Sequence, residues 1–218
     1  VVVGLMQEPG DFGRSLELAR LMPSFFTSTC GIHPHDVAKA QSADWESIAK
    51  ICAMADVVAV GETGLDYFYD HSPRDVQREG FRRQCQLAKS VRKPLVVHVR
   101  DAHEECADIL AAEGVSSGMI HCFTGDRVAA ERYLSLGFSL SISGVVTYKK
   151  NEALQEAVAM TPIDRLMVET DSPYLTPVPF RGKFPNEPAM VAETAKKIAE
   201  LKGQNADAVA LACAHNVK

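Results

Sequence analysis

The sequence predicts an α/β fold built on a parallel sheet, because short apolar runs alternate with amphipathic stretches along the whole chain. Seven runs have the length and composition of buried strands, and each of the last six follows a stretch with helical spacing of apolar residues. Parallel strands joined by helices take right-handed crossovers. Eight such units close a TIM (β/α)8 barrel of about 250 residues. Seven strands in 218 residues therefore predict this barrel with its first strand missing from the sequence.

Local signals set the boundaries of the expected elements. Pro23 ends the first helix, Asp44 is the expected N-cap of the second, and Gly137 is the expected C-cap of the fifth. No repeat, low-complexity tract or linker interrupts the pattern, so residues 1–218 are expected to form a single barrel domain that is incomplete at its N-terminus. The expected strands are 1–5, 24–31, 57–60, 95–97, 119–120, 138–142 and 165–168, and the expected helices are 12–22, 44–55, 74–91, 102–113, 127–136, 152–160, 189–202 and 206–216.

Composition excludes several classes of protein. Hydrophobic residues make up 46% and charged residues 23% of the chain, which is typical of a globular domain and unlike a disordered one. No apolar run approaches the roughly 20 residues that cross a bilayer, so no membrane contact is expected. The net charge of −5 gives no global attraction to nucleic acid, so such a substrate would need local basic residues or metal ions. Six cysteines without a Cys-x-x-Cys pair predict reduced thiols in a cytoplasmic protein.

Carboxylate and imidazole side chains stand at or shortly after the ends of several apolar runs. The carboxyl ends of parallel barrel strands meet on one face, where such folds place their chemistry. Two carboxylates and two imidazoles suit Mg, Mn or Zn. The sequence therefore predicts one metal site assembled from several strands, with Glu62, His98, His121 and Asp171 as candidate ligands.

Each of these residues has a structural alternative when it is considered alone. Glu62 could form a salt bridge to an arginine, and either histidine could be a hydrogen-bonded core residue. Asp171 could be a turn residue ahead of Ser172-Pro173. Glu169 shares a face with Asp171 and could bind the metal or orient a ligand histidine.

Further candidates lie near these positions. His33 and His35 flank Pro34, and one of them could be a ligand or a phosphate donor while the other is a loop residue. Arg100 lies two residues beyond His98 and shares its face. Cys122 points to the opposite face from His121 and is not counted as a ligand.

Five motifs in the same order resemble the TatD family of metal-dependent hydrolases and deoxyribonucleases, most closely its bacterial YcfH-type branch. They occupy residues 31–35, 61–67, 97–101, 120–125 and 168–175. The resemblance implies a (β/α)8 barrel, a centre of one or two metal ions, and Mg-dependent hydrolysis of DNA. It also implies that Glu62 bridges two ions and that His33 lines the substrate site. The family begins with a His-x-His pair of metal ligands at the end of strand one, and this sequence has no such pair before Gly31.

The reaction expected from this resemblance is hydrolysis of a phosphodiester by metal-activated water. Asp171 would orient or deprotonate the water, and His33 and Arg100 would donate to the phosphoryl oxygens as charge develops. DNA is the expected substrate, and the protein is expected to be monomeric. Two alternatives stay open: a barrel hydrolase of a small amide, lactone or phosphoester, and a non-catalytic binding barrel if the N-terminal truncation is genuine.

Overall fold

The structure is a computed structural model that describes residues 2–5, 12–23 and 25–217. The chain divides into two compact units, Val1–Met119 and Ile120–Lys218, which are described in turn. Val1 and Ser24, the first residues of two expected strands, lie outside the described residues.

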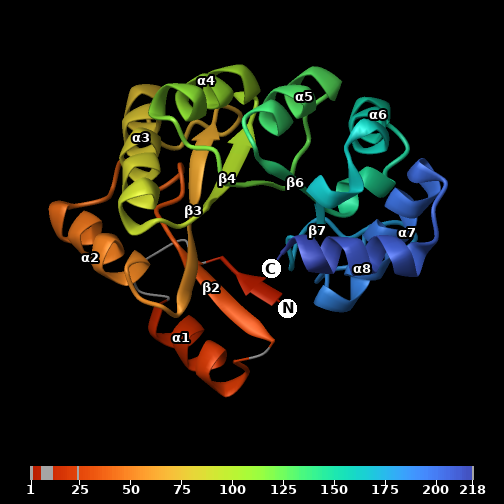
Figure 1. The fold of residues 1–218 in the computed structure, drawn as a ribbon, viewed down its shortest axis with the longest axis horizontal. Coiled ribbons are helices and arrows are strands. Elements are labelled where there is room, and N and C mark those ends of the chain that lie inside the picture. Colours follow the sequence, from red (N-terminus) through yellow and green to blue (C-terminus); the bar gives the residue numbers. More distant parts are fainter. Residues whose placement is uncertain (1, 6–11, 24, 218) are drawn as a thin grey trace. The chain divides into compact units, whose positions relative to one another are not determined.

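The first unit is built on parallel strands that follow one another in sequence order (Figure 1). Each strand pairs with the next, and between the last two strands Gly64 lies opposite His98 and Asp66 lies opposite Arg100. This register brings the polar ends of neighbouring strands together. The strands are β1 (Val2–Gly4), β2 (Phe26–Cys30), β3 (Val57–Asp66) and β4 (Leu95–Arg100).

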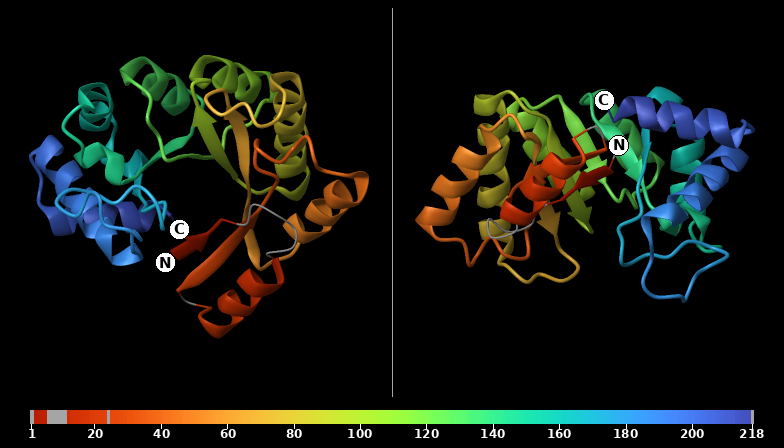
Figure 2. Two further views of the ribbon diagram at one scale, coloured as in Figure 1. Left: turned by 180° about the vertical axis from the view of Figure 1, so that it is seen from behind. Right: turned by 90° about the horizontal axis from the view of Figure 1, so that it is seen from below.

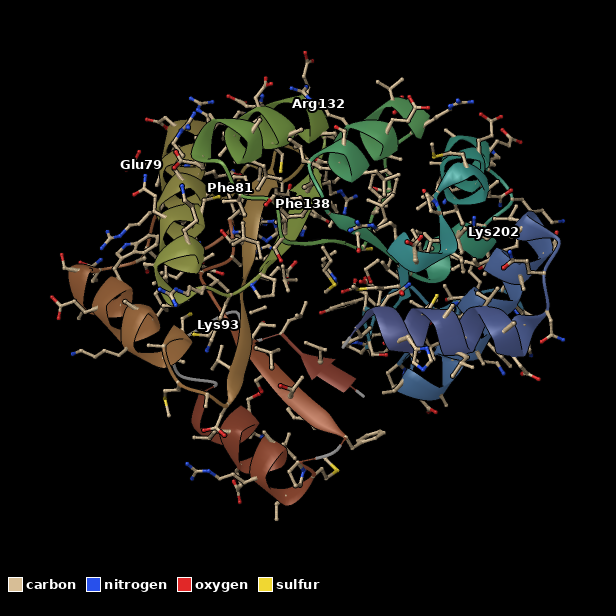
Figure 3. The ribbon with its side chains drawn as sticks, viewed as in Figure 1. Glu79, Phe81, Lys93, Arg132, Phe138 and Lys202 are labelled. Carbon is tan, nitrogen blue, oxygen red and sulfur yellow. The ribbon has the colours of Figure 1, made fainter. Side chains whose placement is uncertain are left out.

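Amphipathic helices cover these strands. Each packs against the strands nearest to it in sequence, α1 on β2, α2 on β2 and β3, α3 on β3 and α4 on β4. Figure 3 shows the two sides of α3: Phe81 points towards the strands and is 1% exposed, whereas Glu79 points away. The apolar face that the sequence predicts is therefore the buried face. The helices are α1 (Phe12–Leu21), α2 (Ser42–Cys52), α3 (Arg74–Val91) and α4 (His103–Glu113).

The second unit has the same alternation. Strand β6 pairs in parallel with β7, and helices α7 and α8 pack on each other and on β7 (Figures 1 and 2). Phe138 is fully buried, and the ammonium group of Lys202 donates to the Thr161 carbonyl at 2.5 Å. The last two residues of β5 (Gly118–His121) belong to this unit. The other elements are α5 (Arg127–Ser135), β6 (Ser139–Ile142), α6 (Glu152–Met160), β7 (Leu166–Val168), α7 (Val191–Lys202) and α8 (Ala206–Asn216).

Strand β3 is longer than the sequence indicates. The expected strand 57–60 stops before the polar residues, but β3 continues to Asp66 because residues 63–66 pair with residues 97–100 of β4. Pairing with a neighbour outweighs the low strand propensity of glycine and aspartate. As a result Glu62 lies inside a strand and not at its end.

Two expected helix caps are wrong. Gln41 is the N-cap of α2, and Asp44 is instead the third helical residue, where its carboxylate accepts from the Gln41 N–H at 2.8 Å. Gln41 and Asp44 form a reciprocal capping box. Asp44 is therefore the N3 residue of the box and not the N-cap itself. At the end of α5 the C-cap is Leu136, and Gly137 follows it with a φ of 91°.

A buried glutamine on α3 holds the segment that carries His33. The Gln84 side chain is 1% exposed, and its carbonyl oxygen accepts from the Ile32 N–H at 2.9 Å. Its amide nitrogen donates to the Ile32 carbonyl, also at 2.9 Å. One side chain therefore satisfies both backbone groups of a buried residue beside the histidine.

We expect the Gln84→Ala variant to lose about 2–4 kcal/mol of unfolding free energy, because it leaves a buried N–H and a buried carbonyl without partners. Gln86→Ala is the matched control, since Gln86 is exposed on the same helix and its side-chain amide donates to the Glu113 carboxylate at 3.3 Å. Its cost should stay within about 0.5 kcal/mol. Urea unfolding of both variants measures the difference, and equal midpoints would contradict the role of Gln84.

Candidate metal centre

In the first unit an imidazole lies between two buried carboxylates. His98 Nδ1 is 3.1 Å from Glu62 Oε1, and His98 Nε2 is 2.9 Å from Asp66 Oδ2. Glu62 and Asp66 are 2% and 0% exposed. Strand geometry explains the placement: residues 62, 64 and 66 of β3 share a face, and His98 of β4 lies opposite Gly64. Because Glu62 and Asp66 flank Gly64 on this face, the imidazole of His98 reaches both carboxylates.

Asp66 uses its oxygens as hydrogen-bond acceptors. Oδ1 accepts from the N–H groups of Phe68 and Tyr69 at 3.1 and 2.9 Å. Oδ2 lies 2.9 Å from Nε2 of both His35 and His98. Burial alone would raise the pKa of this carboxyl, but the bonds from His98, Tyr69 and His35 hold the pKa well below its ordinary value. Asp66 is therefore ionised and has its acceptor positions filled.

This arrangement directs a lone pair of His98 at Glu62. A neutral imidazole carries one N–H, and in the tautomer with the proton on Nε2, His98 donates to the ionised Asp66. Nδ1 then faces Glu62 Oε1 at 3.1 Å with a lone pair on each side. Two facing lone pairs repel unless a cation or a proton lies with them. A buried carboxylate and an imidazole nitrogen held by a second carboxylate form a donor set that fits a divalent metal ion.

His33 and His35 have different roles here. His33 Nδ1 accepts from the His35 N–H at 3.2 Å, so in the neutral ring the proton is on Nε2, which lies 3.6 Å from Glu62 Oε1. That tautomer makes His33 a donor into the site. Burial lowers the pKa of His35, and this effect outweighs the hydrogen bond with Asp66, which raises it. His35 is therefore neutral and donates its ring N–H to the Asp66 carboxylate. His33, Glu62 and His98 nevertheless have ligand atoms close enough together to hold an ion, as do His35, Asp66 and His98.

The second unit contains a similar arrangement. His121 Nδ1 is 2.9 Å from Glu169 Oε2, and His121 Nε2 is 3.5 Å from Asp171 Oδ1. Glu169 Oε1 is buried and has no hydrogen-bond partner within the described residues. In the tautomer with its proton on Nδ1, His121 donates to Glu169 and presents Nε2 to Asp171. The orienting role that the sequence left open for Glu169 is the one that this contact supports.

The other expected residues lie as follows. The Arg100 guanidinium carbon is 4.1 Å from the centre of the Phe68 ring, with the side chain exposed. The Cys122 thiol is 3.1 Å from the Ser143 hydroxyl, and burial raises its pKa to about 12. A protonated thiol is a poor metal ligand, which agrees with leaving Cys122 out of the predicted set.

Asp66 and the role of His35 were missed from the sequence. The expected strand 57–60 leaves Asp66 outside it, although Glu62, Gly64 and Asp66 have the spacing of two that puts residues on one face of a strand. His35 had been weighed only as an alternative to His33. The structure instead pairs His35 with Asp66, and that contact depends on the path of the loop after β2 and on the pairing of β3 with β4, which local sequence does not determine.

The whole chain, residues 1–218, matches the family described as TatD related DNase. The chain belongs to this family. It is 46% identical over 177 residues, or 80% of its length, to the metal-dependent hydrolase YcfH of Escherichia coli, and it spans 66% of the length of that relative. It is 38% identical over 189 residues to the 3'-5' ssDNA/RNA exonuclease TatD of a Rahnella species, covering 84% of this chain and 72% of that protein.

Solved structures agree with the family. YJJV, a TatD homolog from Escherichia coli, superposes with a TM-score of 0.92 at 30% identity, covering 99% of this chain and 83% of the other. The predicted fold class is confirmed: an α/β barrel fold of the TatD type, with seven strands in the part of the chain that the structure describes. Among the described residues, no helix has the length and apolarity that a membrane span requires.

We expect Asp66→Asn to weaken divalent metal binding by about 10- to 100-fold, because an amide donor would face the imidazole N–H that Asp66 now accepts. Isothermal titration of the full-length protein with Mn²⁺ measures this. Asp70→Asn is the control, since Asp70 is exposed and pairs with Arg74 at 2.7 Å. Equal affinities in the two variants would remove Asp66 from the centre.

Proposed function

We propose that this member of the metal-dependent hydrolases is a deoxyribonuclease that hydrolyses phosphodiester bonds. The observation that carries the proposal is the His98 Nδ1 held 3.1 Å from the buried Glu62 oxygen, a donor pair that a divalent cation could bind. The nuclease named TatD in Rahnella, which is 38% identical to this chain, supports DNA as the substrate class. Cleavage of phosphodiesters commonly uses bound divalent metal ions to stabilise the attacking and leaving oxygens.

Four residues would hold one or two ions of Mg, Mn or Zn. They are Glu62 and His98 in the first unit and His121 and Asp171 in the second. When bound, a divalent cation acts as a Lewis acid that polarises a phosphoryl oxygen and makes water a stronger nucleophile near neutral pH.

The chain's own groups would position substrate and move the proton. His33, with its proton on Nε2, donates a hydrogen bond to a phosphoryl oxygen as negative charge develops there. Arg100 donates to a second oxygen of the same phosphate. The side chain of Asp171 is 34% exposed, so its carboxylate can accept a hydrogen bond or the proton from the attacking water.

The rest of the assignment follows the sequence. We take residues 1–218 as part of a single barrel domain that acts as a monomer. All six cysteines are free thiols, which supports a reducing, cytoplasmic location.

The direct test uses the full-length protein with single-stranded and duplex DNA, each with Mg²⁺, with Mn²⁺ or with EDTA. We expect cleavage only with metal, and we expect Glu62→Ala to abolish both cleavage and metal binding, because Glu62 is the buried carboxylate of the donor pair. Metal binding without cleavage of any DNA would sink the nuclease assignment and favour a small-molecule hydrolase.

We expect Asp171→Asn to lower the rate of DNA cleavage by about 100- to 10,000-fold, the range for loss of a general base. The variant should fold, because Asp171 has a φ of 57° and asparagine tolerates that conformation. Asp164→Asn, a change at an exposed acid of the same unit, should cleave DNA like the wild type. Single-turnover rates decide, and full activity of Asp171→Asn would remove this residue from the reaction.

A further inference from the structure

The loop after β3 presents aromatic rings and a cation to solvent. Phe68 and Tyr69 are 56% and 50% exposed, which is unusual for adjacent large aromatic residues. The Arg100 guanidinium carbon lies 4.1 Å from the centre of the Phe68 ring and 5.1 Å from that of Tyr69. The two rings meet edge to face, with their centres 4.9 Å apart. We call these three side chains the aromatic platform.

The backbone beneath the platform is fixed despite the exposure of its rings. The N–H groups of Phe68 and Tyr69 both donate to Asp66 Oδ1. The Tyr67 N–H donates to the Arg100 carbonyl at 2.9 Å, so the loop continues the contact between β3 and β4. The buried Gln77 closes the loop by donating to the carbonyls of Asp66 and Ser72 at 3.0 and 2.8 Å. An exposed aromatic ring whose backbone is already ordered binds a planar ligand at little entropic cost.

The platform also adjoins the candidate metal centre. The Tyr69 ring centre is 5.5 Å from that of His35, and the His35 ring lies 2.9 Å, nitrogen to oxygen, from the Asp66 carboxylate that orients His98. A group that rests on Tyr69 therefore lies close to the residues proposed to hold the metal. Chemistry at the centre and recognition at the platform can act on one substrate.

We propose that the aromatic platform is a nucleobase-stacking subsite for single-stranded nucleic acid, and that Arg100 binds the phosphate next to the stacked base. The inference rests on the proposed function and names the form of its substrate. Aromatic side chains stack on the face of any base. When a guanidinium group stacks flat on an aromatic ring, its N–H groups point outward in its own plane and can bind a phosphate. Bases in a duplex are stacked on their neighbours, so only an unpaired base offers a free face.

The test measures binding rather than cleavage. The full-length protein is titrated, without added metal, against a short fluorescent single-stranded DNA and against an abasic oligomer of the same length and charge. We expect the base-bearing oligomer to bind about 5- to 100-fold more tightly, the range for stacking one base on an aromatic side chain. Fluorescence anisotropy gives both dissociation constants.

The variant Phe68→Leu with Tyr69→Leu removes the rings but keeps apolar side chains in the loop. We expect it to bind the two oligomers equally, with a thermal unfolding midpoint like that of the wild type. Phe25→Leu is the matched control, because Phe25 is 54% exposed and precedes β2, at the opposite end of the parallel strands. It should keep the full preference for bases.

Equal binding of the two oligomers by the wild type would overturn the proposal, and so would a preference for bases that survives loss of both rings. These results are distinguishable from failure of the nuclease assignment. A protein that prefers base-bearing DNA but cleaves none has the subsite without the proposed activity. A protein that cleaves DNA with no preference for bases has the activity without the subsite.

Discussion

The buried negative charge of β3 is the constraint on which the first unit depends. Glu62 and Asp66 are nearly inaccessible to water, and an uncompensated carboxylate in that position would cost several kcal/mol. Compensation comes from three directions. His98 on β4 contacts both carboxylates, and of the two histidines after β2, His33 faces Glu62 and His35 contacts Asp66. Two backbone N–H groups of the loop after β3 donate to Asp66. The path of the surrounding chain is therefore coupled to the charge of these two carboxylates.

The second unit also places a histidine between two carboxylates. His121 is held by Glu169 on one nitrogen and faces Asp171 with the other, just as His98 is held by Asp66 and faces Glu62. In both cases one carboxylate determines which nitrogen is available. The facing carboxylates differ in access to water, since Glu62 is enclosed and the Asp171 side chain is 34% exposed. Glu62 is thus suited to holding an ion, and Asp171 to meeting a solvent-derived nucleophile.

The sequence predicts the fold well because alternation of strands and helices is a local pattern. It also identifies Glu62, His98, His121 and Asp171 as candidates, since each stands near the end of an apolar run. It does not identify Asp66, because the last residues of β3 become a strand only by pairing with β4. The tautomers of His33 and His98 likewise depend on contacts between residues far apart in sequence. Long-range pairing is the information that a local pattern lacks.

The absence of a side chain at Gly64 has a consequence for how variation in this protein would be interpreted. A Cβ at this position would lie 2.0 Å from the His98 carbonyl oxygen, and the φ of +138° is strained for any other residue. A saturation mutagenesis screen would therefore score position 64 as intolerant as the residues proposed to bind metal. That intolerance would report the close approach of the β3 and β4 backbones at this position, and not a chemical role. Functional maps of such sites need a separate measure of folding before an invariant position is counted as catalytic.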